Sequence, residues 1–242
     1  MKDKIIYKII VTIILLSICY FYFIDSINED INRNESIKVT SNINIDNRQI
    51  KENINLLDDW RLTLVNSENE LPKDYKIELA NIDKKRQFDK RAINKLFEMQ
   101  KDMKEDGIFN VWVQSSYRSI NYQQELFEEK INKYLLQGKT KEEAERLTLQ
   151  IINKPGTSEH NLGLAVDFNY VDYSFDETKG FKWLQKNAEK YGFILRYRKD
   201  KKDITKVNYE PWHWRYVGIE HAKKINELDM CLEEYIEYLK NN

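Results

Sequence analysis

The stretch SEHNLGLAVDF, residues 158–168, limits most strongly how this chain can fold. Gly163 lets the chain turn between a polar segment that carries His160 and a short strand-like segment that carries Asp167. The side chains of His160 and Asp167 can then face one point. The sequence contains only three histidines, so a histidine this close to a carboxylate is informative. The stretch predicts either a polar loop before a structural strand or half of a metal site.

A second stretch, YEPWHWRYVG at residues 209–218, carries Glu210 and another histidine, His213. Pro211 disfavours helix at the residue before it, which keeps this segment extended. In an extended segment His213 and Arg215 share one face, and the aromatic residues that alternate with them lie on the other. The segment is therefore predicted to be a strand that presents a histidine from one face.

Together the two stretches offer the parts of a catalytic zinc site. Two imidazoles and one carboxylate are a common ligand set that leaves one coordination position open for water. We therefore predict His160, Asp167 and His213 as ligands of one zinc ion per chain, and Glu210 as the general base. On residue type alone, structural hydrogen-bonding roles for the two histidines remain the alternative. The third histidine, His221, is predicted to be an ordinary helix residue.

The same segments resemble the motifs of a known family. SEHNLGLAVDF is similar to the S-x-H-x-x-G-x-A-x-D signature of the VanY-type D-alanyl-D-alanine carboxypeptidases, and EPWHWRYVG is similar to their E-x-x-W-H-x-R-Y motif. SSYRSINYQ, residues 115–123, is similar to their S-G-Y-R-S-x-x-x-Q segment, and the three occur in the family's order within residues 56–240. The resemblance implies a zinc peptidase with the fold that lysostaphin-type endopeptidases and the hedgehog signalling domain share.

The resemblance also implies a role for each matching residue, and it agrees with the ligands and the base named above. Arg118 matches the family's arginine that contacts the substrate and stabilises oxyanion charge, and Gln123 and Ser158 match residues that hydrogen-bond the substrate peptide. Ser116 stands where the family usually has glycine, in a loop that lines the substrate site. The family pattern therefore does not fix the conformation of this loop or the fit of the substrate's C-terminal residue.

The rest of the sequence predicts an α+β domain over residues 56–242, with a small, largely antiparallel sheet flanked by helices. Helices and short strands mix without a regular βαβ repeat. We predict strands where short apolar or alternating patterns occur, at 60–66, 109–119, 164–168, 193–197 and 209–218. We predict helices where the pattern is amphipathic, at 88–107, 121–138, 140–154, 179–193 and 219–240.

The N-terminal part of the chain has a different composition. Residues 5–24 form an almost continuous apolar stretch that is long enough to span a bilayer, and lysines precede it. We predict a membrane anchor over residues 1–24 with a cytoplasmic N-terminus; a buried core helix is the alternative. The bulky exit CYFYFIDS lacks a small-residue cleavage site, so the anchor is predicted to be uncleaved. Residues 25–55 are predicted to be a polar spacer, with the catalytic domain outside the cell.

Charge and cysteine content exclude other classes of protein. The formal net charge of −1 leaves no positive surplus for binding nucleic acid. The two cysteines lie at opposite ends of the chain and have neither a disulfide framework nor metal-ligand spacing. We predict the membrane as a partner through the N-terminal helix, and no obligate protein partner.

The function that the resemblance implies is that of a zinc D-alanyl-D-alanine carboxypeptidase, which removes the terminal D-alanine from peptidoglycan stem peptides. Serine-type chemistry is not expected. An L,D-carboxypeptidase that trims tetrapeptide stems is a close alternative, because related family members use the same zinc apparatus. A non-catalytic wall-binding module is an alternative from another class, and the presence of Glu210 disfavours it.

Overall fold

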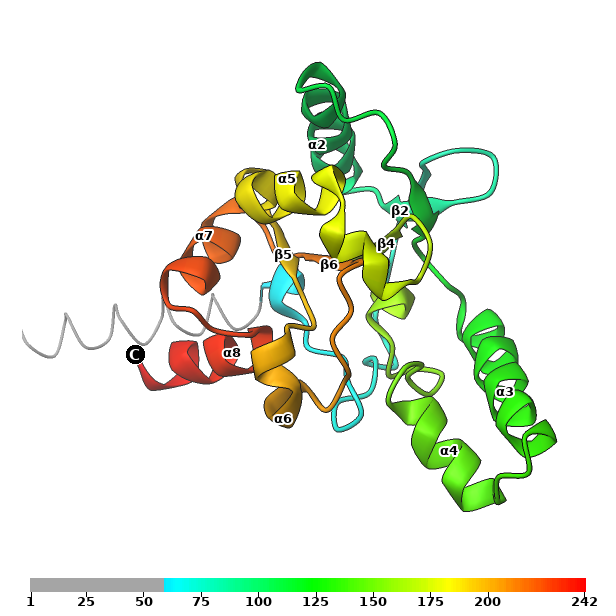
Figure 1. The fold of residues 1–242 in the computed structure, drawn as a ribbon. Coiled ribbons are helices and arrows are strands. Elements are labelled where there is room, and N and C mark those ends of the chain that lie inside the picture. Colours follow the sequence, from blue (N-terminus) through cyan, green and yellow to red (C-terminus); the bar gives the residue numbers. More distant parts are fainter. Residues whose placement is uncertain (1–58) are drawn as a thin grey trace, which may run out of the picture. The chain divides into compact units, whose positions relative to one another are not determined.

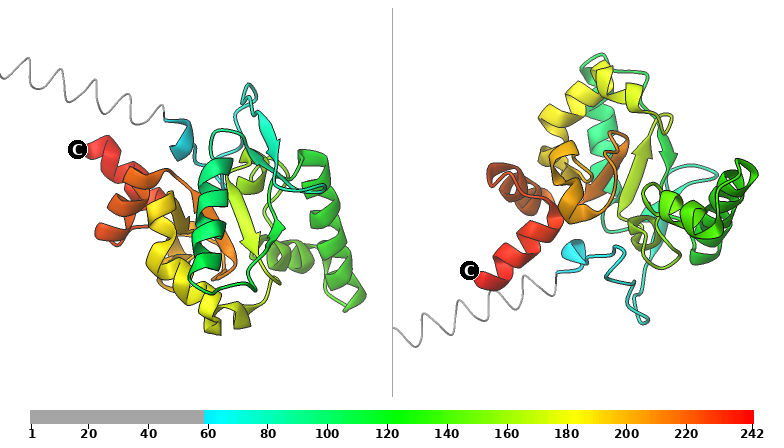
Figure 2. Two further views of the ribbon diagram at one scale, coloured as in Figure 1. Left: turned by 90° about the horizontal axis from the view of Figure 1, so that it is seen from above. Right: turned by 60° about the horizontal axis from the view of Figure 1, so that its bottom comes forward.

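The computed structural model describes residues 59–242, whose arrangement Figures 1 and 2 show. A central sheet has the strand order β3-β4-β6-β5, with antiparallel neighbours throughout. Its strands are β3 Val113–Ser115, β4 Ala165–Phe168, β5 Phe193–Leu195 and β6 His213–Tyr216. A separate hairpin pairs β1, Leu79–Asn81, with β2, Gln87–Asp89. The predicted α+β class with small antiparallel sheets is confirmed.

Helices surround the central sheet. The α-helices are α2 Ile93–Glu105, α3 Ile120–Leu136, α4 Lys141–Leu149, α5 Lys179–Asn187, α6 Lys202–Thr205, α7 Ile219–Glu227 and α8 Leu232–Asn241. Short 3-10 helices lie between them: η1 Trp60–Leu62, η2 Glu159–Leu162, η3 Tyr173–Glu177, η4 Ala188–Tyr191 and η5 Lys199–Lys201. Ser119, Thr140 and Thr178 cap the starts of α3, α4 and α5, because each hydroxyl accepts a backbone N–H of the first turn. The hairpin of α3 and α4 projects from the body of the domain (Figure 1).

The central strands divide their side chains between the core and the functional face. Trp214 and Tyr216 of β6 pack into the main hydrophobic core with Phe168 and Phe193. The predicted alternation of β6, with aromatic residues on one face, is therefore confirmed. A second apolar cluster packs α7 and α8 against the edge strand β5 through Ile194. Removing these large side chains from water is the main stabilising contribution to the fold.

One predicted strand is wrong. Residues 60–66 form η1 followed by an extended segment with a single bridge between Asn66 and Asn69. The Asp59 carboxylate accepts the backbone N–H of Arg61 over 2.9 Å, which favours a 3-10 turn over a strand. A capped turn of this kind places Leu62 in the apolar cluster of α7 and α8 without any sheet pairing.

The C-terminal helix predicted over residues 219–240 is also wrong, because it consists of two helices. Asp229 lies between α7 and α8 with a φ of 54°, a left-handed conformation that ends a helix. The hairpin of β1 and β2 has no counterpart among the predicted strands. Its strands are only three residues long and half of their residues are polar, so they are too short to show the apolar pattern of a buried strand.

Membrane-spanning helices are absent from the described residues, 59–242, since none of the helices there is both long and apolar enough. The anchor predicted over residues 1–24 and the spacer predicted over residues 25–55 lie outside the described residues.

Candidate metal centre and active site

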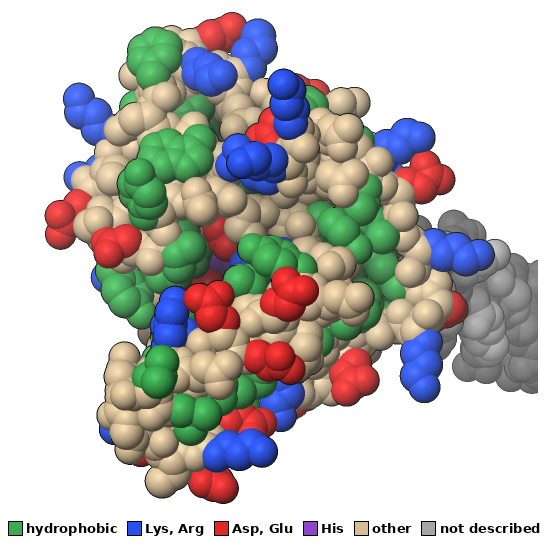
Figure 3. Space-filling view, turned by 90° about the vertical axis from the view of Figure 1, so that its right-hand side faces the viewer, with side chains coloured by type: hydrophobic (Ala, Val, Ile, Leu, Met, Phe, Trp, Pro, Cys, Tyr) green, Lys and Arg blue, Asp and Glu red, His purple; other side chains and the backbone are tan. Residues whose placement is uncertain are grey.

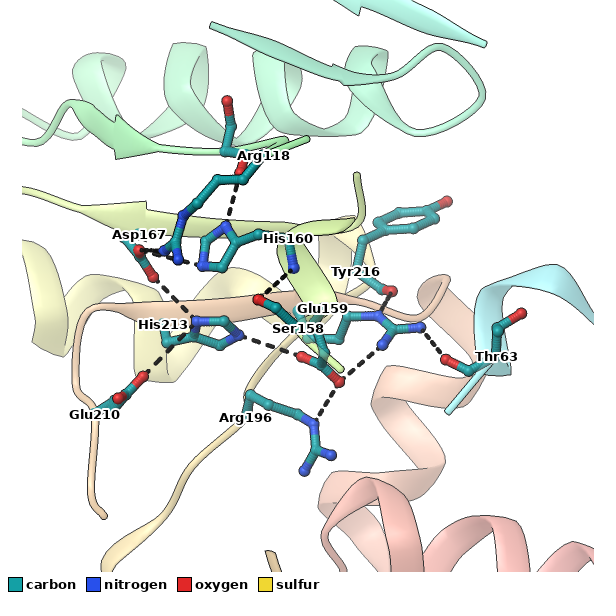
Figure 4. A network of polar contacts seen from close by, with 12 residues as sticks. Thr63, Arg118, Ser158, Glu159, His160, Asp167, Arg196, Glu210, His213 and Tyr216 are labelled. Carbon is teal, nitrogen blue, oxygen red and sulfur yellow. Dashed lines mark hydrogen bonds and ion pairs between the residues drawn. The ribbon is translucent and has the colours of Figure 1, made fainter. Parts of the chain in front are cut away.

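The pairing of β4 with β6 brings the predicted ligands together. Asp167 lies directly opposite His213 in the register of these strands, so the two side chains are cross-strand neighbours on one face. His160 reaches the same point from η2, which ends at Gly163 in the left-handed conformation with a φ of 71°. The Gly163 N–H donates to the His160 carbonyl oxygen over 3.1 Å and closes the turn. The predicted turn is confirmed, and Figure 4 shows the three ligands converging.

His160, Asp167 and His213 form a buried group whose donor atoms fit a metal ion. One ligand atom from each residue lies within 4.8 Å of the other two. Two imidazole nitrogens and one carboxylate oxygen are the donor set of many catalytic zinc sites. Within the part of the chain that the structure describes, no other cluster of histidine, cysteine and carboxylate residues has this spacing.

The ring nitrogens that point away from this centre have their own hydrogen-bond partners. His160 Nδ1 lies 2.7 Å from the carbonyl oxygen of Ser116, an acceptor, so this nitrogen carries the proton. His213 Nε2 lies 3.2 Å from a carboxylate oxygen of Glu159 and donates to it. His160 Nε2 and His213 Nδ1 then face Asp167, at 3.2 and 3.0 Å. Such outer partners fix the ring orientation of metal-binding histidines.

Burial and neighbouring charges shift the pKa of each predicted ligand. Burial and Arg118 lower the pKa of His160 to about 4, so this imidazole is neutral at pH 7, as metal binding requires. Burial alone would raise the pKa of Asp167, but its contacts with His160 and His213 lower it. Burial alone would lower the pKa of His213, but hydrogen bonds to Asp167 and Glu159 raise it to about 9. A metal that binds His213 must therefore displace a proton at neutral pH.

Glu210, the predicted base, lies at the edge of this centre. Its Oε2 is 3.8 Å from His213 Nδ1, and the residue is 6% exposed. Burial raises the pKa of Glu210 to about 8. A purely structural Glu210 would pair with a nearby base such as Lys206 or Arg215. Neither ion pair forms, because Lys206 donates to a backbone carbonyl oxygen and Arg215 pairs with Glu159. Within residues 59–242, no lysine or arginine forms an ion pair with Glu210.

Arg118 lies beside the metal centre and makes three side-chain hydrogen bonds. Its Nη2 donates to Asp167 over 2.9 Å, its Nη1 to Gln123 over 3.0 Å and its Nε to Ser115 over 2.9 Å. Gln123 is fully buried and also donates to the carbonyl oxygen of Asn153. The structure thus places Gln123 where it holds Arg118, and its contact with substrate stays a prediction.

Ser158 and Ser116 support η2 and His160. The Ser158 hydroxyl accepts the His160 N–H over 3.4 Å, which caps η2 at the edge of the cleft. Ser116 is not among the described non-glycine residues with positive φ, so its backbone accepts a side chain without strain. Serine in place of the family's glycine therefore leaves intact the carbonyl that orients His160.

A cleft of about 810 Å³ opens over the centre, and Figure 3 shows the hollow on the face that carries α3 and α4. The ligands and Glu210 lie inside it, and α3 forms a wall with Tyr122, Leu126 and Lys130. This volume is in the range of pockets that bind small peptides and other ligands.

Three fully buried charged residues beneath the centre are absent from the predicted site. Glu159 pairs with Arg196 over 2.7 Å and with Arg215 over 2.8 Å. The available signals are weak: Glu159 precedes His160, Arg196 follows the apolar strand β5, and Arg215 lies between two aromatic residues of β6. The two pairs join positions 37 and 56 residues apart, so no local pattern connects them.

With this geometry in view, comparison with known proteins identifies the family. The chain matches VanY, the D-alanyl-D-alanine carboxypeptidase family, over residues 85–219, more than half of its length. This chain belongs to the VanY family. The matched segment contains every residue predicted for the site.

Individual relatives agree with this assignment. A D-alanyl-D-alanine carboxypeptidase of Enterococcus faecalis is 40% identical over 178 residues, which cover 74% of this chain and 66% of the relative. A variant of a vancomycin-resistance VanY D,D-pentapeptidase, solved in complex with Zn(II), is 40% identical in sequence and superposes with a TM-score of 0.67. The match covers 74% of this chain and 99% of that chain. The LdcB LD-carboxypeptidase structure is 37% identical with a TM-score of 0.61, covering 72% of this chain and 84% of that one.

The predicted family is confirmed. The predicted zinc agrees with the relative that was solved in complex with Zn(II), and the predicted carboxypeptidase class agrees with the names of these relatives. The chain spans about two thirds of the length of the Enterococcus faecalis relative. The roles of the individual site residues rest on their geometry in this chain.

Proposed function

We propose that this VanY-family enzyme is a D,D-carboxypeptidase that removes the terminal D-alanine from peptidoglycan stem peptides. The observation that carries the proposal is the buried set of His160, Asp167 and His213 in a cleft beside Glu210. His160 Nε2, His213 Nδ1 and an Asp167 oxygen would hold zinc. When bound, zinc supplies Lewis-acid polarisation of the substrate carbonyl and activation of a water molecule.

Glu210 supplies the general base of the proposed reaction. Burial raises the pKa of Glu210, so its carboxylate is a stronger base than an exposed one. It takes a proton from the attacking water and returns that proton to the leaving amine, so one side chain serves both steps. A lysine or arginine paired with Glu210 would weaken this basicity, and the described residues place none there.

Arg118 supplies positive charge next to the reacting carbonyl. Its guanidinium is held rigidly by Gln123, Ser115 and Asp167, and it is 14% exposed towards the cleft. A donor fixed in this way stabilises developing oxyanion charge without the cost of reorganising during the reaction. Gln123 and Ser158, which line the same cleft, are proposed to hydrogen-bond the peptide substrate.

The likeness to the LdcB LD-carboxypeptidase supports a second candidate, cleavage of tetrapeptide stems. Synthetic muropeptides that end in D-Ala-D-Ala or in a single D-Ala distinguish the two candidates, with mass spectrometry of the products. Release of D-alanine from the first substrate alone is expected. Release from the second alone makes the enzyme an L,D-carboxypeptidase, and release from neither, with retained binding to peptidoglycan, makes it a binding module.

We also propose that residues 1–24 anchor the enzyme in the cell membrane as a single span, with the catalytic domain outside. The apolar composition of residues 5–24 and the lysines before them support this orientation. An external domain would meet its peptidoglycan substrate directly.

A further inference from the structure

A buried charge cluster lies behind His213, on the side of its ring that faces away from Asp167 (Figure 4). Glu159 Oε1 accepts Arg196 Nε over 2.7 Å and Arg215 Nη1 over 2.8 Å. The other oxygen, Oε2, lies 3.2 Å from His213 Nε2. The side chains of Glu159, Arg196 and Arg215 are all 0% exposed. Each carboxylate oxygen therefore has its own partners: the arginines bind one, and His213 binds the other.

The rest of the fold holds Glu159 in this orientation. Arg196 also donates to Glu233 of α8, with Nη1 at 2.8 Å and Nη2 at 2.6 Å. Arg215 Nη2 also donates to two backbone carbonyl oxygens of segment 61–63, at 2.9 and 3.0 Å. Two carboxylates thus balance two guanidinium groups in the buried cluster, as buried charges require. Because both arginines are fixed at several points, the Glu159 carboxylate has no freedom to turn away from His213.

We propose that Glu159 is a positioning residue that selects the ring nitrogen of His213 available for metal. An ionised carboxylate only accepts hydrogen bonds, so the Nε2 that faces Glu159 carries the proton. A neutral imidazole has a single N–H, and the lone pair therefore lies on Nδ1, which faces Asp167. The opposite tautomer would direct an N–H at the metal. This inference rests on the proposed zinc function.

Glu159→Gln tests the proposal with almost no change in volume. The amide oxygen must face the Arg196 and Arg215 donors, so the amide NH2 group faces His213 Nε2. His213 Nε2 then has to accept, which moves the ring proton to Nδ1 and blocks the metal-binding lone pair. Loss of such an outer partner typically lowers metal affinity by about 10-fold to 100-fold, the loss expected here.

Glu233→Gln is the matched control. Glu233 binds the same Arg196 but makes no hydrogen bond to His213. Both variants should lose thermal stability, since both weaken the buried cluster, but only Glu159→Gln should lose zinc affinity. Zinc dissociation constants come from competition with a chromophoric chelator on the full-length protein. In the zinc-loaded wild type, long-range ¹H–¹⁵N NMR should show His213 protonated at Nε2.

Equal zinc affinities in wild type and Glu159→Gln overturn the proposal, and so do equal losses in Glu159→Gln and Glu233→Gln. If Glu159→Gln does not fold, the NMR measurement still decides, because a wild-type His213 that carries its proton on Nδ1 contradicts the proposal. A wild-type protein that binds no zinc refutes the proposed function instead. In that case the same NMR measurement on neutral His213 still tests Glu159, because the proposal predicts the ring proton on Nε2 and not on Nδ1.

Discussion

Gly163→Ala should destabilise the domain and weaken the metal centre together. Gly163 has a φ of 71°, which costs an alanine about 1–2 kcal/mol. An added Cβ would also lie 2.4 Å from Ile77 Cδ1 and 3.4 Å from the Asp89 backbone nitrogen. The Ile77 side chain has to move, and overpacking of this kind costs about 1–3 kcal/mol. The total loss in the free energy of unfolding is therefore about 2–5 kcal/mol.

Gly138→Ala separates the two contributions. Gly138 has a φ of 83° but no neighbouring atom within 4 Å of an added Cβ, so only the backbone cost applies. Denaturant unfolding of both variants gives the loss in each, and zinc content is measured on the same preparations. Gly163→Ala should exceed Gly138→Ala by about 1–3 kcal/mol and should bind zinc more weakly, since the turn carries His160 to the ligand group. Equal losses with unchanged zinc binding would refute the role given to this turn.

Three further predictions concern charge and location. Arg118→Ala should lower turnover about 100-fold at saturating zinc, because an oxyanion loses a charged donor; an unchanged rate contradicts this. Burial alone would raise the pKa of Glu159, but Arg196 and Arg215 lower it below the ordinary 4.5. The stabilisation that ionised Glu159 gives to the fold is complete above pH 4.5 and is lost as the pH falls. With chelator present, the unfolding midpoint should therefore drop steeply in acid, and a midpoint that stays level contradicts this. Protease added to intact spheroplasts should degrade the domain; protection while an external control is cut contradicts the anchor proposed for residues 1–24.

The candidate metal ligands could be proposed from the sequence because zinc chemistry restricts both residue type and local geometry. Gly163 ends η2 before β4, as predicted. Pro211 lies in a turn, so the predicted extended segment is a strand only over His213–Tyr216. The direct pairing of Asp167 with His213 depends on strand register. The hydrophobic pattern fixes which face each strand buries, but the pattern within one segment does not show which residue of a distant strand lies opposite.

The buried cluster around Glu159 was beyond prediction for a physical reason. Its partners are distant in sequence: Arg196 follows β5 and Arg215 lies in β6. Their charges resemble interruptions of apolar segments until the fold joins them. The strand predicted over residues 60–66 failed differently. A local side-chain cap at Asp59 competes with strand pairing there, and alternation of apolar residues does not reveal which prevails.

Substituting Glu210 separates a zinc carboxypeptidase from a zinc-stabilised binding module most directly. Glutamine is nearly isosteric with Glu210, whose Oε2 lies 3.8 Å from His213 Nδ1. The substitution breaks no ion pair with lysine or arginine within residues 59–242. Metal stoichiometry and muropeptide turnover are measured on one preparation of Glu210→Gln. We predict that zinc is retained while turnover falls by about 10²-fold to 10⁴-fold, because the general base is lost. Zinc retained with turnover within a few-fold of wild type would contradict the catalytic role of Glu210.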